Sequence, residues 1–122
     1  MTFTLSQLLA AMIAVESGGD PGKVGDYVNG KATAIGILQI HKIAVDDVNT
    51  RYGSHWTWPD DCYDVGASKL IWFDYCRWRG GAKFNAEKWS RAFNGGPHGW
   101  LKPSTLAYWL KVKAELEKQK GS

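Results

Sequence analysis

Apolar residues recur with a helical period in several stretches of the chain, and the first of these stretches ends on an acid. Along residues 5–17 one helical face carries Leu5, Leu8, Leu9, Met12, Ile13 and finally Glu16, at the i, i+3, i+4 spacing of an amphipathic helix. Thr4 and Gln7 match a capping box at its start, and Gly18-Gly19 predicts its end. The face that buries the leucines therefore points the Glu16 carboxylate inward.

Four further helices follow from the same periodicity. We expect them over about residues 42–52, from Pro59-Asp60-Asp61 to about Arg79, over about residues 86–93, and from about Ser104 onward. The last of them has an apolar face of Leu106, Trp109, Leu110, Val112 and Leu116. Burial is the expectation for the tryptophans on these helices, which are Trp72, Trp78, Trp89 and Trp109.

The β candidate lies between the first two helices. Asn29-Gly30 stands between two short segments of strand character, which is the strongest short-range signal for a hairpin. An apolar run over residues 34–40 follows, and Gly36 within it indicates a close approach of the backbone to another group. The whole pattern predicts a mainly α fold of about five to six helices with one small β-hairpin near residues 26–34.

Length and charge fit one domain over residues 1–122, long enough to bury a single core. The formal net charge is +3, but the basic residues are scattered and no nucleic-acid-binding motif accompanies them, so no nucleic-acid partner is expected. No apolar run reaches the roughly 18 residues of a membrane span, and no signal peptide is recognisable.

The two cysteines, Cys62 and Cys76, fall within one predicted helix. Their separation along that helix would be about 21 Å, beyond the reach of roughly 7 Å that a disulfide allows, unless Cys62 precedes the helix. Free, mostly buried thiols are therefore expected. Because His41, His55 and His98 stand apart from one another, no metal site and no cofactor are expected.

Glu16 needs a chemical explanation because it lies on an apolar face. In the last turn of a helix, partial burial and the negative end of the helix dipole disfavour the carboxylate and raise its pKa. A carboxyl group of raised pKa can act as a general acid near neutral pH. The plainer alternative is an ion pair with a Lys or Arg beneath a loop.

Four short blocks follow one another along the chain: Glu16-Ser17, Ala34-x-Gly36-x-x-Gln39-Ile40, Ala92-Phe93-Asn94-Gly95-Gly96 and Tyr108-x-x-x-Val112. In this order and at this spacing they resemble the lytic transglycosylases of the soluble-transglycosylase type, within the lysozyme-like superfamily. The resemblance covers about residues 5–113. It implies a lysozyme-like α+β fold whose hairpin lines the substrate cleft.

The resemblance implies a peptidoglycan lytic transglycosylase with Glu16 as its single acid. In that family the acid protonates the glycosidic oxygen of the MurNAc–GlcNAc bond and then takes the proton of the C6 hydroxyl as a 1,6-anhydro ring closes. The further positions expected to bind the glycan are Ser17, Gln39, Ile40, Phe93, Asn94, Trp100 and Tyr108.

Each binding role has a plainer alternative. Ser17 would brace the helix end or touch the sugar, but it is also a plain helix cap. Gln39 and Asn94 would hydrogen-bond the glycan, but they also suit an internal loop staple and a turn of positive φ. Tyr108 would orient Glu16 or simply belong to the core. Phe93 replaces the family's usual Tyr and keeps a stacking face.

Asp26 opens a different reading. It lies ten residues after Glu16, with Thr33 beyond it, where some lysozyme-like hydrolases place a second acid and a Thr that hold the attacking water. Asp26 would then make the protein a lysozyme-type or chitin-directed hydrolase. The plainer alternative is that Asp26 only begins a turn. A non-catalytic glycan-binding domain is the third reading.

The expected partner is the glycan strand of peptidoglycan, and the chain is expected to act as a monomer at the cell wall or in the periplasm, without membrane insertion. Since no signal peptide is recognisable, the sequence fits a phage endolysin or a domain of a larger secreted protein.

Overall fold

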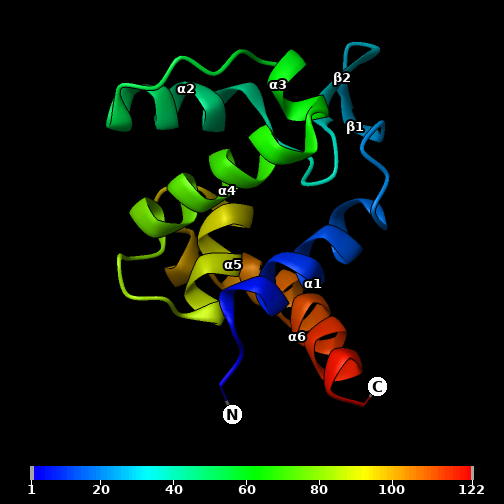
Figure 1. Cartoon of the computed structure of the whole chain (residues 1–122), viewed down its shortest axis with the longest axis vertical. Coiled ribbons are helices and arrows are strands. Elements are labelled where there is room, and N and C mark those ends of the chain that lie inside the picture. The colour runs from blue at the N-terminus through cyan, green and yellow to red at the C-terminus, as the bar shows by residue number, and fades with distance from the viewer. Residues whose placement is uncertain (1, 122) are drawn as a thin grey trace. The chain divides into compact units, whose positions relative to one another are not determined.

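The fold is mainly helical (Figure 1). A computed structural model describes residues 2–121, and these contain six α-helices, two short 3-10 helices and one antiparallel two-stranded sheet. The predicted fold class is therefore confirmed. The elements are α1 (Leu5–Ser17), β1 (Val24–Val28), β2 (Lys31–Ile35), α2 (Lys42–Tyr52), α3 (Asp60–Tyr63), α4 (Val65–Arg79), α5 (Ala86–Gly95), η1 (Gly99–Leu101), η2 (Pro103–Thr105) and α6 (Leu106–Gly121).

The residues gather into two compact units, each with buried side chains of its own. The first unit comprises residues 1–15 and 76–122, and the second comprises residues 16–75. Helices α1 and α4 contribute residues to both units. Glu16 and Ser17, at the end of α1, belong to the second unit.

In the first unit α5 packs against α6, η1 and η2. Its buried side chains include Leu8, Ala11, Met12, Trp89, Ala92, Thr105, Val112 and Leu116. Arg91 ties α5 to η2, because its guanidinium donates to Thr105 Oγ1 (2.8 Å), to the Lys102 carbonyl (3.0 Å) and to Glu87 Oε2 (2.8 Å). These three hydrogen bonds, all donated by the planar guanidinium group of Arg91, fix α5 relative to η2.

The start of α1 confirms the predicted capping box. The Thr4 amide donates to Gln7 Oε1 at 2.8 Å, and the Gln7 amide donates to Thr4 Oγ1 at 3.1 Å. The helix ends where Gly18 adopts a φ of +64°, a conformation that glycine reaches without a steric penalty. Only part of the predicted face is buried: Leu8 and Met12 are inside, while Glu16 is half-buried. Ala11, which lies outside the predicted face, is buried as well.

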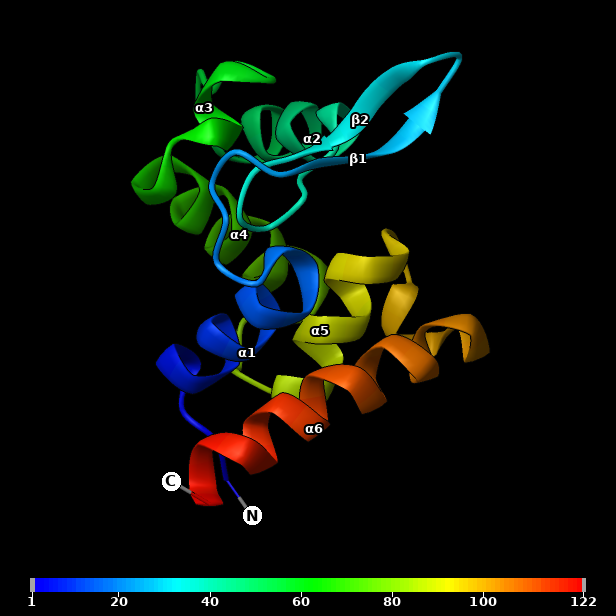
Figure 2. The ribbon, with the colours of Figure 1, turned by 90° about the vertical axis from the view of Figure 1, so that its right-hand side faces the viewer.

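In the second unit the hairpin forms where the sequence predicts it, as a two-stranded ribbon (Figure 2). Val28 pairs with Lys31 across the Asn29-Gly30 turn, and Val24 pairs with Ile35 at the other end. Asn29 and Gly30 have φ values of 51° and 77°, as a tight hairpin turn of the left-handed type requires.

After the hairpin the chain makes a buried turn whose tight point is Gly36. Ile35 and Ile40 pair as an isolated bridge on either side of it. Gly36 has a φ of +82°, and a Cβ atom there would lie 1.9 Å from the Cys62 carbonyl oxygen. The close backbone approach predicted from the sequence is confirmed.

The third predicted helix, from residues 59 to 79, is wrong as a single element. It is two helices, α3 and α4, separated at Asp64, which has the extended φ and ψ of −82° and 125°. The Asp64 carboxylate accepts from the Ala67 amide at 2.8 Å and so caps the start of α4. Cys62 therefore precedes the helix that holds Cys76, and both thiols are buried and free.

The apolar face predicted for the last helix is partly wrong. Val112 and Leu116 are buried, but Leu106 and Leu110 are 45% and 55% exposed. Residues four apart share one helical stripe, so the stripe of Val112 and Leu116 takes the core position and the two leucines lie off it. The tryptophans divide similarly, since Trp72 and Trp89 are buried while Trp78 and Trp109 are half-buried.

Candidate functional site

Glu16 lies half-buried in the last turn of α1, and its backbone is held from two sides. Lys23 Nζ donates to the Glu16 carbonyl at 2.8 Å, which places a cation where a helix leaves carbonyl groups without partners. Ser17 Oγ donates to the Ile37 carbonyl at 2.8 Å and accepts from the Gly19 amide at 3.1 Å. These two bonds fit both the brace and the helix cap expected of Ser17, and its contact with a sugar stays a prediction.

Gln39 ties together the base of the hairpin and the Gly36 turn. Its Nε2 group donates to the Lys23 carbonyl at 3.0 Å and to the Gly36 carbonyl at 2.9 Å, and Gln39 itself has a φ of 51°. Both hydrogens of the side-chain amide thus bind backbone carbonyls, as expected if Gln39 holds the loop together. A hydrogen bond from a glycan to the Gln39 amide oxygen stays a prediction.

Ile40 is part of the core, with an exposed fraction of 1%. Its carbonyl accepts from the Trp58 indole nitrogen at 3.0 Å and from the Ile35 amide at 3.2 Å. The side chain of Ile40 therefore packs inside the second unit, and its contribution is to fix the backbone that leads into α2.

Asp26 is held in an unusual backbone conformation on β1. Its φ is 50°, a value that few residues other than glycine adopt. The Thr33 hydroxyl on β2 donates to the Asp26 carbonyl. The Asp26 carboxylate accepts from a second residue, because its Oδ2 lies 3.0 Å from His41 Nε2.

His41 is the residue that sequence reasoning missed at this place. It lies 15 positions after Asp26 and directly before α2, at the N-cap position, where its side chain makes no capping bond. The spacing of the two residues in the sequence does not predict this contact. It depends on how the chain folds back after the hairpin. The available signal was that a lone His directly follows the Gly36–Ile40 block.

The remaining predicted residues lie in the first unit. Phe93 and Tyr108 are half-buried on α5 and α6, and Asn94 is exposed in the last turn of α5. The alternative of a positive-φ turn at Asn94 is wrong, because Asn94 is helical. Their contacts with a glycan stay predictions.

Trp100, one of the positions expected to bind the glycan, lies in η1. Lys88 Nζ is 4.7 Å from the centroid of the Trp100 ring, within cation–π distance. A cavity of about 310 Å³ lies beside this pair, and it is lined by Asn85, Glu87, Lys88, Arg91 and Trp100. A saccharide that stacked on the half-buried Trp100 ring would therefore also meet the Lys88 ammonium group.

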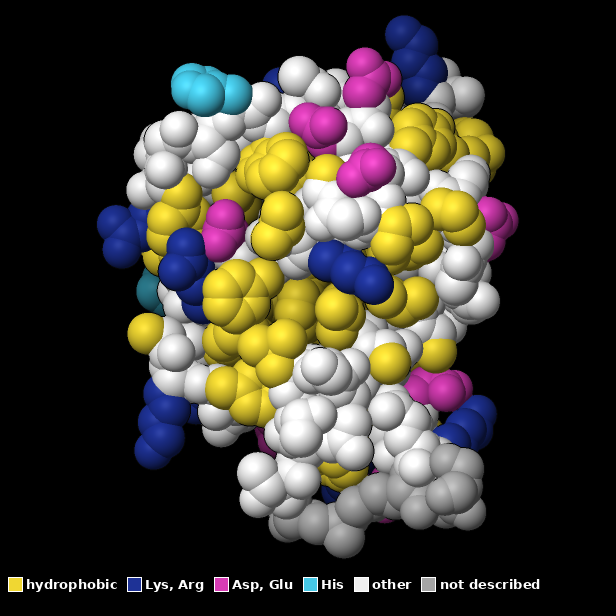
Figure 3. Space-filling model, viewed as in Figure 1, with side chains coloured by type: hydrophobic (Ala, Val, Ile, Leu, Met, Phe, Trp, Pro, Cys, Tyr) yellow, Lys and Arg dark blue, Asp and Glu magenta, His cyan; other side chains and the backbone are white. Residues whose placement is uncertain are grey.

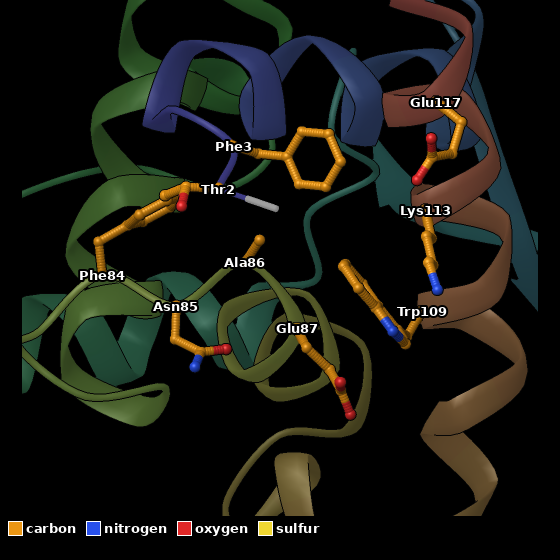
Figure 4. A pocket seen from close by; sticks show the side chains of 9 residues that line it. All are labelled: Thr2, Phe3, Phe84, Asn85, Ala86, Glu87, Trp109, Lys113 and Glu117. Atoms are coloured by element: carbon orange, nitrogen blue, oxygen red, sulfur yellow. The ribbon is translucent and has the colours of Figure 1, made fainter. Parts of the chain in front are cut away.

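A second cavity of the first unit, about 510 Å³, involves none of the predicted residues (Figure 4). Three aromatic residues from separate stretches, Phe3, Phe84 and Trp109, lie around it together with charged side chains of α5 and α6. No pattern in the sequence joined these positions. The cavity shares Asn85 and Glu87 with the smaller one.

The described part of the chain was searched for groups of metal-binding side chains and for helices that could span a membrane. Within residues 2–121 no group of three or more His, Cys, Asp or Glu side chains is arranged to hold a metal ion. Over the same residues, no helix has the length and apolar character needed to cross a membrane.

Comparison with known proteins identifies the family. The family model described as "Transglycosylase SLT domain" matches residues 3–115. A lysozyme of Ostrea edulis is 34% identical over 93 residues, which are 75% of this chain and 66% of that lysozyme. The match thus spans just under two thirds of that relative's length.

Two solved structures resemble the fold. One is the lysozyme of Tapes japonica, with a TM-score of 0.70, 25% identity, and coverage of 87% of this chain and 85% of that one. The other is a chain of the complex of Aeromonas hydrophila PliI with Meretrix lusoria lysozyme, with a TM-score of 0.74, 22% identity, and coverage of 88% and 87%. The chain belongs to the transglycosylase SLT domain family, within the lysozyme-like superfamily.

Proposed function

We propose that this chain is a muramidase-type enzyme that cleaves the glycan strands of peptidoglycan at the cell wall, by hydrolysis, with Glu16 as general acid and Asp26 as the base that activates water. The observation that carries hydrolysis is the second carboxylate. Asp26 belongs to the same compact unit as Glu16, and Thr33, His41 and a left-handed backbone hold it in place. An acid that served only to begin a turn would not need a partner on another element.

The chemistry divides between the two carboxyl groups. Glu16 gives its proton to the glycosidic oxygen as the bond from C1 of MurNAc to that oxygen breaks, and the bonding electrons leave with the oxygen. Water then adds to C1 and passes a proton to the Asp26 carboxylate. In most families of glycosidases a carboxylic acid and a carboxylate take these two roles, and each proton transfer contributes about 10²–10⁴ in rate.

The scaffold supports Glu16 as the acid. Lys23 and Ser17 fix the peptide groups at the end of α1, so the carboxyl group is presented from a rigid element and not from a mobile loop. Preorganised groups on helices and strands hold reacting atoms more precisely than loops do.

The family model favours a second candidate, the lytic transglycosylase. In that reaction the C6 hydroxyl of MurNAc replaces water, and Glu16 alone serves first as acid and then as base. The matched Glu16-Ser17 and Gln39 positions support it. The two candidates share the bond that breaks and differ in the group that attacks C1.

Mass spectrometry of the fragments released from purified peptidoglycan tests both candidates. A hydrolysed reducing end is heavier by one water than a 1,6-anhydro end. We expect reducing ends from the wild type, a loss of at least about 100-fold in their rate for Glu16→Gln, and a loss of about tenfold to 100-fold for Asp26→Asn.

Asp46→Asn is the matched control, because Asp46 is also an exposed carboxylate that accepts from a side chain of the same unit, Lys42 Nζ at 2.8 Å. It should leave the rate unchanged. Anhydro ends alone, with Asp26→Asn as active as the wild type, would reject hydrolysis in favour of transglycosylation. No fragments from the wild type would reject both and leave a glycan-binding domain.

A further inference from the structure

We propose that His41 is a positioning residue for Asp26, which it holds on the hairpin so that the carboxylate can take the proton of the attacking water. The inference rests on the proposed function and adds a residue that the catalytic pair requires. It is carried by the 3.0 Å contact between His41 Nε2 and Asp26 Oδ2 and by the different ways in which the two residues are anchored.

His41 stands on fixed backbone. The peptide before it belongs to Ile40, whose amide and carbonyl both pair with Ile35 and whose carbonyl also accepts from Trp58. The His41 carbonyl accepts from the amides of Ala44 and Val45, at 3.1 and 3.4 Å, at the start of α2. The imidazole is half-exposed, with 44% of the side chain accessible, on a backbone that is held on both sides.

Asp26 stands on the more exposed element. Its side chain is 69% exposed, and its neighbours on the hairpin, Tyr27 and Val28, are 65% and 58% exposed. Thr33 holds the Asp26 carbonyl but not the carboxylate. Without His41, rotation about the side-chain bonds of Asp26 would be limited by no other hydrogen bond from residues 2–121.

The contact has a defined direction. A carboxylate can only accept, so His41 Nε2 carries the hydrogen, in the neutral Nε2–H tautomer or in the imidazolium. The bond occupies Oδ2 and leaves Oδ1 as the oxygen that accepts the proton from water. An exposed pair of this kind contributes little to global stability, so its value lies in orienting a reacting group, where small displacements cost large factors in rate.

The test compares three substitutions. His41→Leu removes the donor, and His41→Gln retains an N–H close to the position of Nε2. His55→Leu makes the same change at an exposed His that precedes Trp56 in the loop after α2. We expect the rate of reducing-end formation to fall about tenfold for His41→Leu, to recover to within about threefold for His41→Gln, and to stay at the wild-type value for His55→Leu.

A double-mutant cycle separates positioning from general structural damage. If His41 acts through Asp26, adding His41→Leu to Asp26→Asn should cause no further loss in the rate of reducing-end formation, whereas independent effects would multiply. Any anhydro ends should form at the same rate with and without His41→Leu, because that step needs only Glu16. Thermal unfolding of each variant is measured alongside.

The outcomes are distinct from those of the proposed function. Three results with an active wild type would overturn the role of His41 alone. His41→Leu could be as active as the wild type, its loss could multiply with that of Asp26→Asn, or it could lower reducing ends and anhydro ends in parallel. A wild type without activity overturns the proposed function first. Selective loss of reducing ends that Gln rescues supports the inference.

Discussion

At position 36 the second unit has no room for any side chain. The Gly36 φ of +82° disfavours any side chain, and a Cβ atom would lie 1.9 Å from the Cys62 carbonyl oxygen, a backbone atom that cannot rotate away. The conflict would push the 36–39 turn away from α3. This turn carries Gln39 and precedes His41, so a fault at Gly36 would reach the candidate site.

We therefore expect Gly36→Ala to lower the free energy of unfolding by at least about 3 kcal/mol. Gly30→Ala is the matched control, because Gly30 has a similar φ of +77° but a Cβ atom added there would meet no atom within 4 Å. It should cost only about 1 kcal/mol, which is the strain of the backbone conformation alone. Chemical denaturation of both variants makes the measurement, and equal losses would show that the contact with Cys62 does not matter.

The other residue-scale lesson concerns polar side chains that are committed to the backbone. Ser17 and Gln39 both match the family pattern, and both use their hydrogens on main-chain carbonyls within the second unit. Their positions in the pattern are thus explained in part by the need to hold the end of α1 and the Gly36 turn. Identity at a motif position does not by itself separate binding from support.

At the scale of elements, the break between α3 and α4 depends on one carboxylate. Asp64 accepts from the Ala67 amide at 2.8 Å, and its extended backbone ends one helix and begins the next. Ser68 then reaches back, donating its hydroxyl to the Cys62 carbonyl at 2.8 Å. These two bonds satisfy backbone groups that a continuous helix would have satisfied internally.

We expect Asp64→Ala to destabilise the protein by about 1 kcal/mol, the usual value of an N-terminal helix cap. Asp64→Asn keeps an oxygen acceptor at the same place and should cost no more than about a few tenths of that loss. Thermal or urea unfolding of the two variants provides the comparison. If Ala and Asn lose the same amount, the carboxylate oxygen is not a cap.

At the scale of the whole molecule, basic and acidic residues are dispersed along the chain. On the face shown in Figure 3, Lys and Arg side chains are interspersed with Asp and Glu side chains. A phosphate backbone is bound by concentrated positive charge. The chain has 15 basic and 12 acidic residues, and they are interspersed along the sequence as well.

Global stability should depend on pH through a buried thiol. Burial, with the nearby Asp61 carboxylate as a smaller cause, raises the pKa of Cys62 from 9.0 to about 12. The unfolded chain loses this proton near pH 9 and the folded chain only near pH 12, so the stabilisation is fully present below about pH 9 and is lost as pH rises toward 12.

Relative to Cys62→Ala, the wild type should therefore lose about 2 kcal/mol of unfolding free energy between about pH 8 and pH 10.5. The comparison with the variant removes the contribution of lysines and tyrosines that titrate in the same range. Urea unfolding at several pH values makes the measurement. A constant difference between the two proteins would mean that the thiol ionises equally in both states.

Much of the fold could be predicted because its signals are local. The capping box at Thr4, the glycines after α1, the Asn29-Gly30 turn and the bounds of α2 depend on residues within a few positions of one another. The three-dimensional form of these elements follows from backbone sterics and helix-end hydrogen bonding, which a short stretch of sequence expresses directly. The same locality placed Glu16 in the last turn of α1.

The sequence by itself thus determined most of the secondary structure, the position of Glu16 and the family pattern. Only the tertiary structure decided which of two apolar stripes α6 buries and that Asp26 meets His41 across 15 positions. These outcomes depend on which distant groups compete for the same space or hydrogen bond. That competition is settled by packing in three dimensions, and no local period in the chain records it.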